Sequence, residues 1–168
     1  GDICRLPGIV ALAEKYGARV MVDDAHGFGV LGPGGRGTAA HFGLQDKVDI
    51  TMLTFSKSLA SIGGCMLSSK KVYDYVAHSS RPFIFSASIT PCGAATALAA
   101  LQQLEKDPER PERLMRIAQY FRTQLLDAGV NLIEAPTPIV PIFTYKTLDT
   151  LWYGKALFDA GVYVNPVI

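Results

Sequence analysis

Three short apolar runs constrain the fold of this chain more than any other feature of its sequence. Residues 19–23, 49–54 and 64–67 are compact and apolar, as buried parallel strands are. Over residues 6–16, apolar residues recur with a period of about 3.6 and Gly17 follows, which predicts a short amphipathic helix. A helix, a strand, a loop and a further strand in succession predict an α/β layer architecture.

The rest of the chain is predicted to be mainly helical. A charged, proline-containing stretch at 107–111 separates two long predicted helices, so we expect a domain boundary there, between residues 1–107 and 108–168. The predicted helices cover residues 70–78, 91–106, 112–128 and 149–160. The predicted strands cover residues 139–145 and 162–164.

The composition favours a small-molecule partner over nucleic acid or a membrane. The 168 residues include 16 Lys and Arg and 15 Asp and Glu, so positive and negative charges nearly balance. Proteins that bind the phosphate backbone of nucleic acids usually carry an excess of basic residues, which this chain lacks. The apolar stretches are shorter than the roughly 18 residues that suggest a transmembrane segment. Cys4, Cys65 and Cys92 are odd in number and far apart, so we expect no disulfide, no metal site and a reducing, cytoplasmic location.

A glycine-rich loop follows the first predicted strand. Residues 27–32 match the G-x-G-x-x-G pattern of dinucleotide sites, which keeps an NAD-dependent oxidoreductase among the hypotheses. That pattern requires a helix to begin at its second or third glycine, whereas residues 33–37 prolong a loop in which a helix cannot form. A glycine-rich surface loop with tight turns is the favoured interpretation.

Chemically active side chains follow the first two predicted strands. Asp23 and His26 come after one strand, and Thr54, Ser56 and Lys57 after the next, where open α/β sheets bind their ligands. A lysine in apolar surroundings loses proton affinity, and its neutral amine can attack a carbonyl. Pyridoxal 5′-phosphate (PLP) needs such a lysine, a carboxylate for its ring nitrogen and donors for its phosphate. A solvated Asp–His pair and a surface lysine are the alternatives for each segment alone.

These segments together resemble the α-oxoamine synthase family of fold-type-I PLP-dependent enzymes. Their order and spacing follow the family pattern, which is highly specific in combination. The matching segments are residues 22–27, the glycine-rich run ending at Arg36-Gly37, Asp49, residues 54–57 with Gly63-Gly64, residues 81–88 and residues 161–166. The resemblance therefore covers essentially the whole chain.

The resemblance implies an aspartate aminotransferase-like α/β fold that is only partly present. Residues 1–107 correspond to the later part of the large PLP-binding domain, and residues 108–168 to the start of the small C-terminal domain. Family members are more than twice as long, so we expect this chain to be a fragment. The residue that stacks on the cofactor ring and the arginine that binds the substrate carboxylate are expected outside it.

The resemblance also assigns roles to individual residues. Lys57 corresponds to the lysine that forms a Schiff base with PLP and moves the Cα proton of the substrate. Asp23 corresponds to the carboxylate on the pyridine nitrogen, and His26 to the histidine beside the ring hydroxyl. Thr54 and Ser56 correspond to residues around the phosphate. In the family's homodimer, candidates to approach the neighbouring subunit's cofactor are Ser86, Ser88 and Thr90.

The implied reaction is a decarboxylative condensation of an amino acid with an acyl-CoA. Residues 54–64 and 81–88 are most similar to bacterial serine palmitoyltransferases, which join L-serine and a long-chain acyl-CoA to give 3-ketosphinganine for sphingolipids. Glycine C-acetyltransferase and 8-amino-7-oxononanoate synthase share nearly all of these residues and stay open as alternatives. The alternative from a different functional class is a non-catalytic paralogue of these enzymes.

Overall fold

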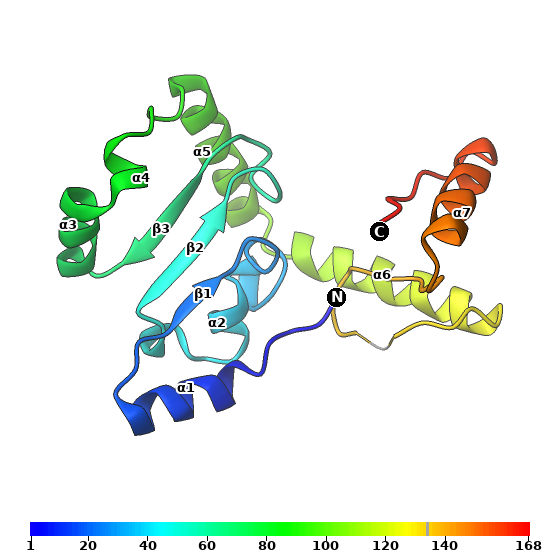
Figure 1. The fold of residues 1–168 in the computed structure, drawn as a ribbon, viewed down its shortest axis with the longest axis horizontal. Coiled ribbons are helices and arrows are strands. Elements are labelled where there is room, and N and C mark those ends of the chain that lie inside the picture. The colour runs from blue at the N-terminus through cyan, green and yellow to red at the C-terminus, as the bar shows by residue number, and fades with distance from the viewer. Residues whose placement is uncertain (134) are drawn as a thin grey trace. The chain divides into compact units, whose positions relative to one another are not determined.

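The fold is built around a small mixed sheet (Figure 1). A computed structural model describes residues 1–133 and 135–168 of the chain. Strands β1 (Met21–Asp23), β2 (Ile50–Thr54) and β3 (Gly64–Ser68) lie side by side in that order. β1 pairs parallel with β2, with Asp23 opposite Met52. The carboxyl ends of these two strands therefore meet at one edge of the sheet.

The orientation predicted for the third strand is wrong, because β3 runs antiparallel to β2. A parallel connection needs a crossover of about a dozen residues or more, usually a helix. Residues 55–63 contain no helix, and the Phe55 N–H donates to the Gly63 carbonyl at 2.9 Å. The short loop therefore returns the chain directly beside β2 and reverses its direction.

The helices agree closely with the periodicity of the sequence. α1 has the predicted bounds and ends before Gly17, which adopts a left-handed conformation with φ of 64°. α5 has the predicted bounds, whereas α2, α4 and two 3-10 turns were not predicted. The helices are α1 (Leu6–Tyr16), α2 (Thr38–His41), α3 (Lys70–Ser79), α4 (Arg81–Ile84), α5 (Pro91–Lys106), α6 (Arg110–Asp127) and α7 (Thr147–Asp159). The 3-10 turns are η1 (Pro33–Gly35) and η2 (Gln45–Lys47).

The main apolar core lies where α1 packs against β1 and α2. Leu6, Val10 and Ala13 recur at helical spacing on one face of α1 and are buried. They contact Val20, which precedes β1, Val22 within β1, and Ala39 of α2. Burial of this face fixes the position of β1 and hence of the segment that follows it.

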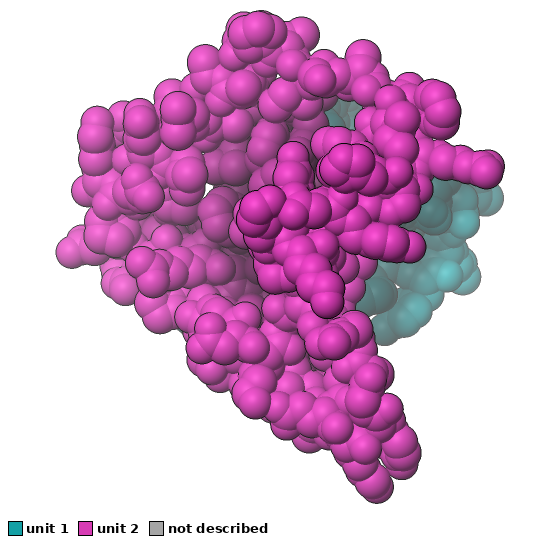
Figure 2. Space-filling view, turned by 90° about the vertical axis from the view of Figure 1, so that its left-hand side faces the viewer, with its two compact units in different colours: residues 1, 118–168 teal, residues 2–117 magenta. Residues whose placement is uncertain are grey.

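The contacts within the chain divide it into two compact units, coloured separately in Figure 2. One unit comprises Asp2–Ile117 and the other comprises Gly1 with Ala118–Ile168, so the division falls within α6. In the latter unit the buried Arg122 guanidinium donates to the carbonyls of Thr137 at 2.8 Å and Ile139 at 3.4 Å. The domain boundary predicted at 107/108 stays a prediction.

Both strands predicted in the second half of the chain are wrong. Among the described residues of 139–145, only Ile142 is paired, in an isolated bridge with Leu132. Pro141 lacks an N–H for a ladder, and Tyr145 has a positive φ of 62°, which breaks an extended run. Residues 162–164 form no strand either.

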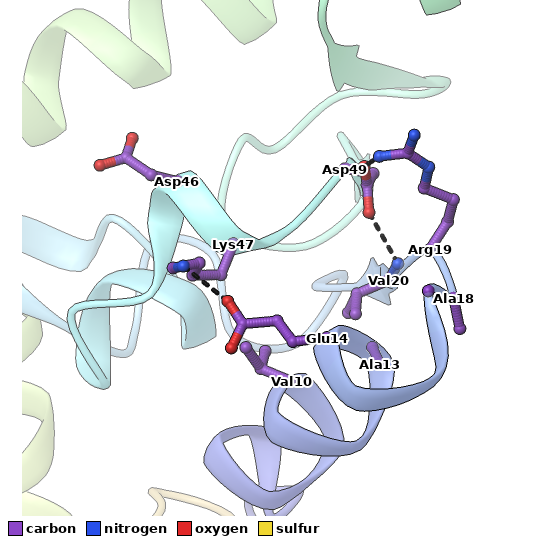
Figure 3. Close-up of a pocket in the computed structure, with 10 residues that line it drawn as sticks. Val10, Ala13, Glu14, Ala18, Arg19, Val20, Asp46, Lys47 and Asp49 are labelled. Atoms are coloured by element: carbon purple, nitrogen blue, oxygen red, sulfur yellow. Dashed lines mark hydrogen bonds and ion pairs between the residues drawn. The ribbon is translucent and has the colours of Figure 1, made fainter.

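A cavity of about 340 Å³ lies between the end of α1 and the segments that enter β1 and β2 (Figure 3). Its lining carries two ion pairs, Lys47 with Glu14 at 2.6 Å and Arg19 with Asp49 at 2.9 Å. Asp49 also accepts a hydrogen bond from the Val20 N–H at 2.8 Å. This bond, and secondarily Arg19, lowers the pKa of Asp49 below its ordinary value of 3.8. Asp49 therefore links the entries of the two parallel strands.

Shortening Leu6 should destabilise the protein strongly, because this side chain is 1% exposed in the core. Leu6→Ala should lower the free energy of unfolding by about 2 to 5 kcal/mol, measured by urea denaturation. Leu12→Ala is the matched control on the same helix, because Leu12 is 57% exposed. Its effect should stay within about 0.5 kcal/mol of the wild type. Equal losses in both variants would contradict the position of the core.

Removing the Asp49 carboxylate should change the acid dependence of stability. A lowered pKa in the folded state means that Asp49 stabilises the fold above its unfolded pKa, and that this contribution disappears as the pH falls through the folded pKa. Asp49→Asn should therefore be less stable than the wild type at pH 7, and the difference should shrink towards pH 2. Urea midpoints across this range test it, with Asp46→Asn as the control for loss of a nearby charge. A constant difference would contradict the role of Asp49.

Candidate functional site

The first group of predicted site residues follows β1. Asp23 is the last residue of this strand, is exposed, and accepts a hydrogen bond from the Ala25 N–H at 3.1 Å through Oδ1. His26 is exposed in the turn that begins the glycine-rich loop. Both side chains are thus available at the edge of the sheet where β1 and β2 end.

The second group follows β2. Thr54 ends the strand opposite Gly64, and its hydroxyl oxygen is buried without a hydrogen-bond partner among the described residues. Ser56 and Lys57 are exposed on the loop that follows. The described residues therefore do not provide the apolar surroundings that the sequence suggested for Lys57. An unpartnered buried hydroxyl is costly unless a ligand or water satisfies it.

Backbone hydrogen bonds close the loop that carries Lys57. The Ser61 N–H donates to the Phe55 carbonyl at 2.7 Å, and the Ala60 N–H to the Lys57 carbonyl at 3.1 Å. Ala60 adopts a positive φ of 50°, which is uncommon for a residue other than glycine. Leu59 is buried and anchors the middle of the loop. We call residues 55–63 the lysine loop.

The two groups come together through Gly29. This glycine has a φ of 79°, and a Cβ placed on it would lie 2.4 Å from the Cβ of Ser58. Such a distance is too short for any side chain, so the glycine-rich loop approaches the lysine loop where only glycine fits. Because Ser58 follows Lys57 and Gly29 lies close to His26, this contact joins the two predicted groups.

The segment before α5 also borders the lysine loop. Thr90 caps α5, and its hydroxyl accepts from the Gly93 N–H at 3.2 Å. The Ser61 hydroxyl donates to the Gly93 carbonyl at 2.7 Å, which connects this helix start to the lysine loop. Ser86 and Ser88 are exposed between α4 and α5. The roles of Ser86, Ser88 and Thr90 stay predictions.

Sequence reasoning missed Asp24, which is only 3% exposed. Its Oδ2 accepts from the Thr38 N–H at 2.8 Å, and its Oδ1 from the Thr38 hydroxyl at 2.5 Å. Two signals point to this role: alternation along the strand places Asp24 with the buried Val20 and Val22, and glycines flank its carboxylate from both ends of the loop.

The glycine-rich loop has a different purpose from the one its pattern suggests. No helix begins at its second or third glycine, since η1 is a 3-10 turn and α2 begins only at Thr38. A Cβ at Gly27 or at Gly37 would lie 2.0 Å from a carboxylate oxygen of Asp24. These glycines therefore make room for a buried carboxylate, and the helix N-terminus that a dinucleotide pyrophosphate needs is missing here.

Other kinds of site receive no support from the described residues. The cavity of Figure 3 lies where β1 and β2 begin, at the opposite end from Lys57, and four of its charged groups form the two ion pairs Arg19–Asp49 and Lys47–Glu14. Within residues 1–133 and 135–168, no three His, Cys, Asp or Glu side chains gather as metal ligands, and no helix has the length and apolarity to cross a membrane. Cys4, Cys65 and Cys92 are free thiols.

Comparisons with known proteins agree with this geometry. The family described as aminotransferase class I and II matches residues 1–167. A serine palmitoyltransferase of Sphingobacterium spiritivorum is 49% identical over 168 residues, which is 100% of this chain and 42% of that protein. An 8-amino-7-oxononanoate synthase of Thermosipho melanesiensis is 42% identical over 167 residues, which is 99% of this chain and 43% of that protein.

A solved structure extends the agreement to three dimensions. A serine palmitoyltransferase variant from S. paucimobilis with a bound PLP–myriocin aldimine matches with a TM-score of 0.92 and 36% identity, over 98% of this chain and 43% of that one. The chain thus spans less than half the length of these relatives, and the predicted fold-type-I architecture with a partial large domain is confirmed. The chain therefore belongs to the aminotransferase class I and II family.

Proposed function

We propose that the protein containing this chain is a PLP-dependent acyltransferase that condenses L-serine with a long-chain acyl-CoA to 3-ketosphinganine. In that reaction the Cα of serine becomes bonded to the acyl carbon, CoA leaves as its thiol, and the serine carboxyl group leaves as carbon dioxide. The observation that carries the proposal is that Lys57 is exposed three residues after Thr54, whose hydroxyl is buried at the end of β2 without a hydrogen-bond partner among the described residues.

The chemistry of the donor set fits PLP. A phosphate oxygen is an acceptor that would satisfy the Thr54 hydroxyl, and Ser56 on the same loop offers a second donor. Lys57 provides the amine that a cofactor aldehyde requires. Asp23 stands exposed at the parallel strand end, where its carboxylate can pair with a protonated ring nitrogen. These residues come from one compact unit, Asp2–Ile117.

Each residue then has a defined task. PLP, when bound, supplies a conjugated ring that withdraws electrons from the Cα of the amino acid. Asp23 keeps a proton on the ring nitrogen and so maintains that withdrawal. Lys57 would hold the cofactor through its Nζ, and the same Nζ would take up the Cα proton of the amino acid. His26 would orient the ring beside its hydroxyl group, and Thr54 and Ser56 would bind the phosphate.

The assembly and location follow from the same proposal. The protein acts as a homodimer in which Ser86, Ser88 and Thr90 approach the neighbouring subunit's cofactor, and it works in the cytoplasm. Exposure of Ser86 and Ser88 and the position of Thr90 beside the lysine loop support this arrangement.

The choice of substrate rests on the relatives. The serine palmitoyltransferase named above is 49% identical to this chain, whereas the 8-amino-7-oxononanoate synthase named above is 42% identical. The second candidate is therefore 8-amino-7-oxononanoate synthase, which the same site chemistry would serve. Glycine C-acetyltransferase, which shares nearly all of these residues, is the third candidate.

Loss of the Lys57 amine should abolish covalent cofactor attachment. The full-length wild-type protein mixed with PLP should develop a visible absorption band that borohydride removes, and peptide mapping should locate the reduced adduct on Lys57. Lys57→Ala should give no such adduct at position 57, because alanine has no amine that could react with the cofactor aldehyde.

Lys47→Ala is the matched control, because Lys47 is ion-paired with Glu14 at the other end of the strands. This variant should keep the wild-type band. An adduct on a different lysine would refute the assignment of Lys57, and a folded protein that takes up no PLP would favour a non-catalytic paralogue.

A substrate panel should separate the three synthases. Serine, glycine and alanine are each offered with acetyl-CoA, pimeloyl-CoA and palmitoyl-CoA, and release of the CoA thiol is measured. We expect serine with palmitoyl-CoA to be the best pair. Activity restricted to alanine with pimeloyl-CoA, or to glycine with acetyl-CoA, would replace the sphingolipid assignment by one of its alternatives.

A further inference from the structure

The buried carboxylate of Asp24 has no task in the proposed chemistry, although it adjoins residues that do. We propose that Asp24 and Thr38 form a positioning pair that closes the glycine-rich loop and, through Gly29, holds the lysine loop in place. This inference rests on the proposed function only for its cofactor readout, since the pair and its contacts are features of the fold itself.

The pair satisfies a carboxylate that is almost fully removed from water. Asp24 is 3% exposed and Thr38 is 7% exposed. Each carboxylate oxygen accepts one hydrogen bond from Thr38, at 2.8 Å from the backbone N–H and at 2.5 Å from the hydroxyl. A buried carboxylate that loses such a donor is costly, so the two residues are held together strongly.

The backbone around Asp24 fixes both sides of the pair. The Asp24 N–H donates to the Met52 carbonyl at 2.9 Å, which ties the residue to β2. The Asp24 carbonyl accepts from the N–H groups of Gly27 at 3.1 Å and Phe28 at 2.9 Å, which forms the turn containing His26. Asp24 therefore connects the strand, the histidine turn and, through Thr38, the far end of the loop.

The space around the carboxylate leaves no freedom for a larger group. Additional atoms on Gly27 or Gly37 would lie 2.0 Å from the Asp24 oxygens, so the loop is packed directly on the carboxylate. The loop is also braced internally, because the Gly29 N–H donates to the Gly35 carbonyl at 2.7 Å. Movement of Thr38 would thus be transmitted to Gly29 rather than absorbed by empty space.

Gly29 completes the connection to the lysine loop. Its close approach to Ser58, the residue after Lys57, means that a displaced glycine-rich loop would displace Ser58 or lose contact with it. The pair neither touches the reacting atoms nor binds the cofactor. It acts through Gly29 and Ser58 on Lys57, and through the turn on His26.

Thr38→Val tests the pair in the full-length protein, because valine keeps the shape of threonine and the backbone N–H but lacks the hydroxyl. We expect the dissociation constant for PLP to rise roughly tenfold or more, the range that loss of one hydrogen bond to a charged group gives. The pH midpoint of the Lys57-bound absorption band should also shift. Thr38→Ser, which retains the hydroxyl, should restore both values to near wild type.

Thr137→Val is the matched control for simple destabilisation. Thr137 is also 7% exposed, and its hydroxyl donates to the Gly1 carbonyl at 2.6 Å. Both residues belong to the unit that does not contain Asp24 and Thr38. This variant should lower the urea midpoint without changing the pH midpoint of the band. A Thr38→Val protein that matches the wild type in PLP affinity and pH midpoint, or that merely matches Thr137→Val, would overturn the proposal.

Two further measurements cover the remaining outcomes. If Thr38→Val does not fold, Asp24→Asn keeps the size but removes the charge, and must raise the PLP dissociation constant and shift the same midpoint; unchanged values would overturn the proposal. If the wild type takes up no PLP, the proposed function is wrong but the positioning role of the pair can still be tested. The test is then the rate at which trinitrobenzene sulfonate labels Lys57. Thr38→Val must change this rate by roughly threefold to tenfold relative to Thr137→Val, and an equal rate in the two variants would overturn the role of the pair.

Discussion

The parallel pairing of β1 with β2 is the constraint on which the rest of the site depends. It places Asp23 opposite Met52, so both strands end at the same edge of the sheet. The segments containing His26 and Lys57 leave from that edge, although they are distant in sequence. Open α/β sheets bind ligands there because loops can converge without interrupting the sheet. The core formed by Leu6 against Val22 keeps β1 in this register.

Two adjacent aspartates have opposite roles because of strand geometry. Successive side chains point to opposite sides of a strand. Asp23 is exposed and available to a ligand, whereas Asp24 is buried and satisfied by Thr38. Exchanging their tasks would bury an unpaired charge or leave the loop without its closing bond, and each change is costly. Of these two adjacent residues, Asp23 is therefore available to bind a ligand, whereas Asp24 stabilises the glycine-rich loop.

Much of this architecture could be predicted from the sequence, and the failures have identifiable causes. Helices α1 and α5 were predictable because their boundaries are local: Gly17 ends one, and Thr90 caps the other before Pro91. The direction of β3 was not, since strand direction depends on the connection rather than on the apolar pattern. The predicted strand at 139–145 failed because strand formation needs a partner, and periodicity does not supply one.

The glycine-rich loop illustrates why a motif needs its structural surroundings before it indicates a function. Glycines that approach a bound pyrophosphate and glycines that approach a buried carboxylate can have the same spacing, because both allow an anionic group to lie against the backbone. What differs is the origin of the anion. In this chain the anion is Asp24, supplied by the protein itself, and the donors come from Thr38 instead of a long helix. The loop thus uses its glycines for internal support, and this support leads to the contact between Gly29 and Ser58, next to Lys57.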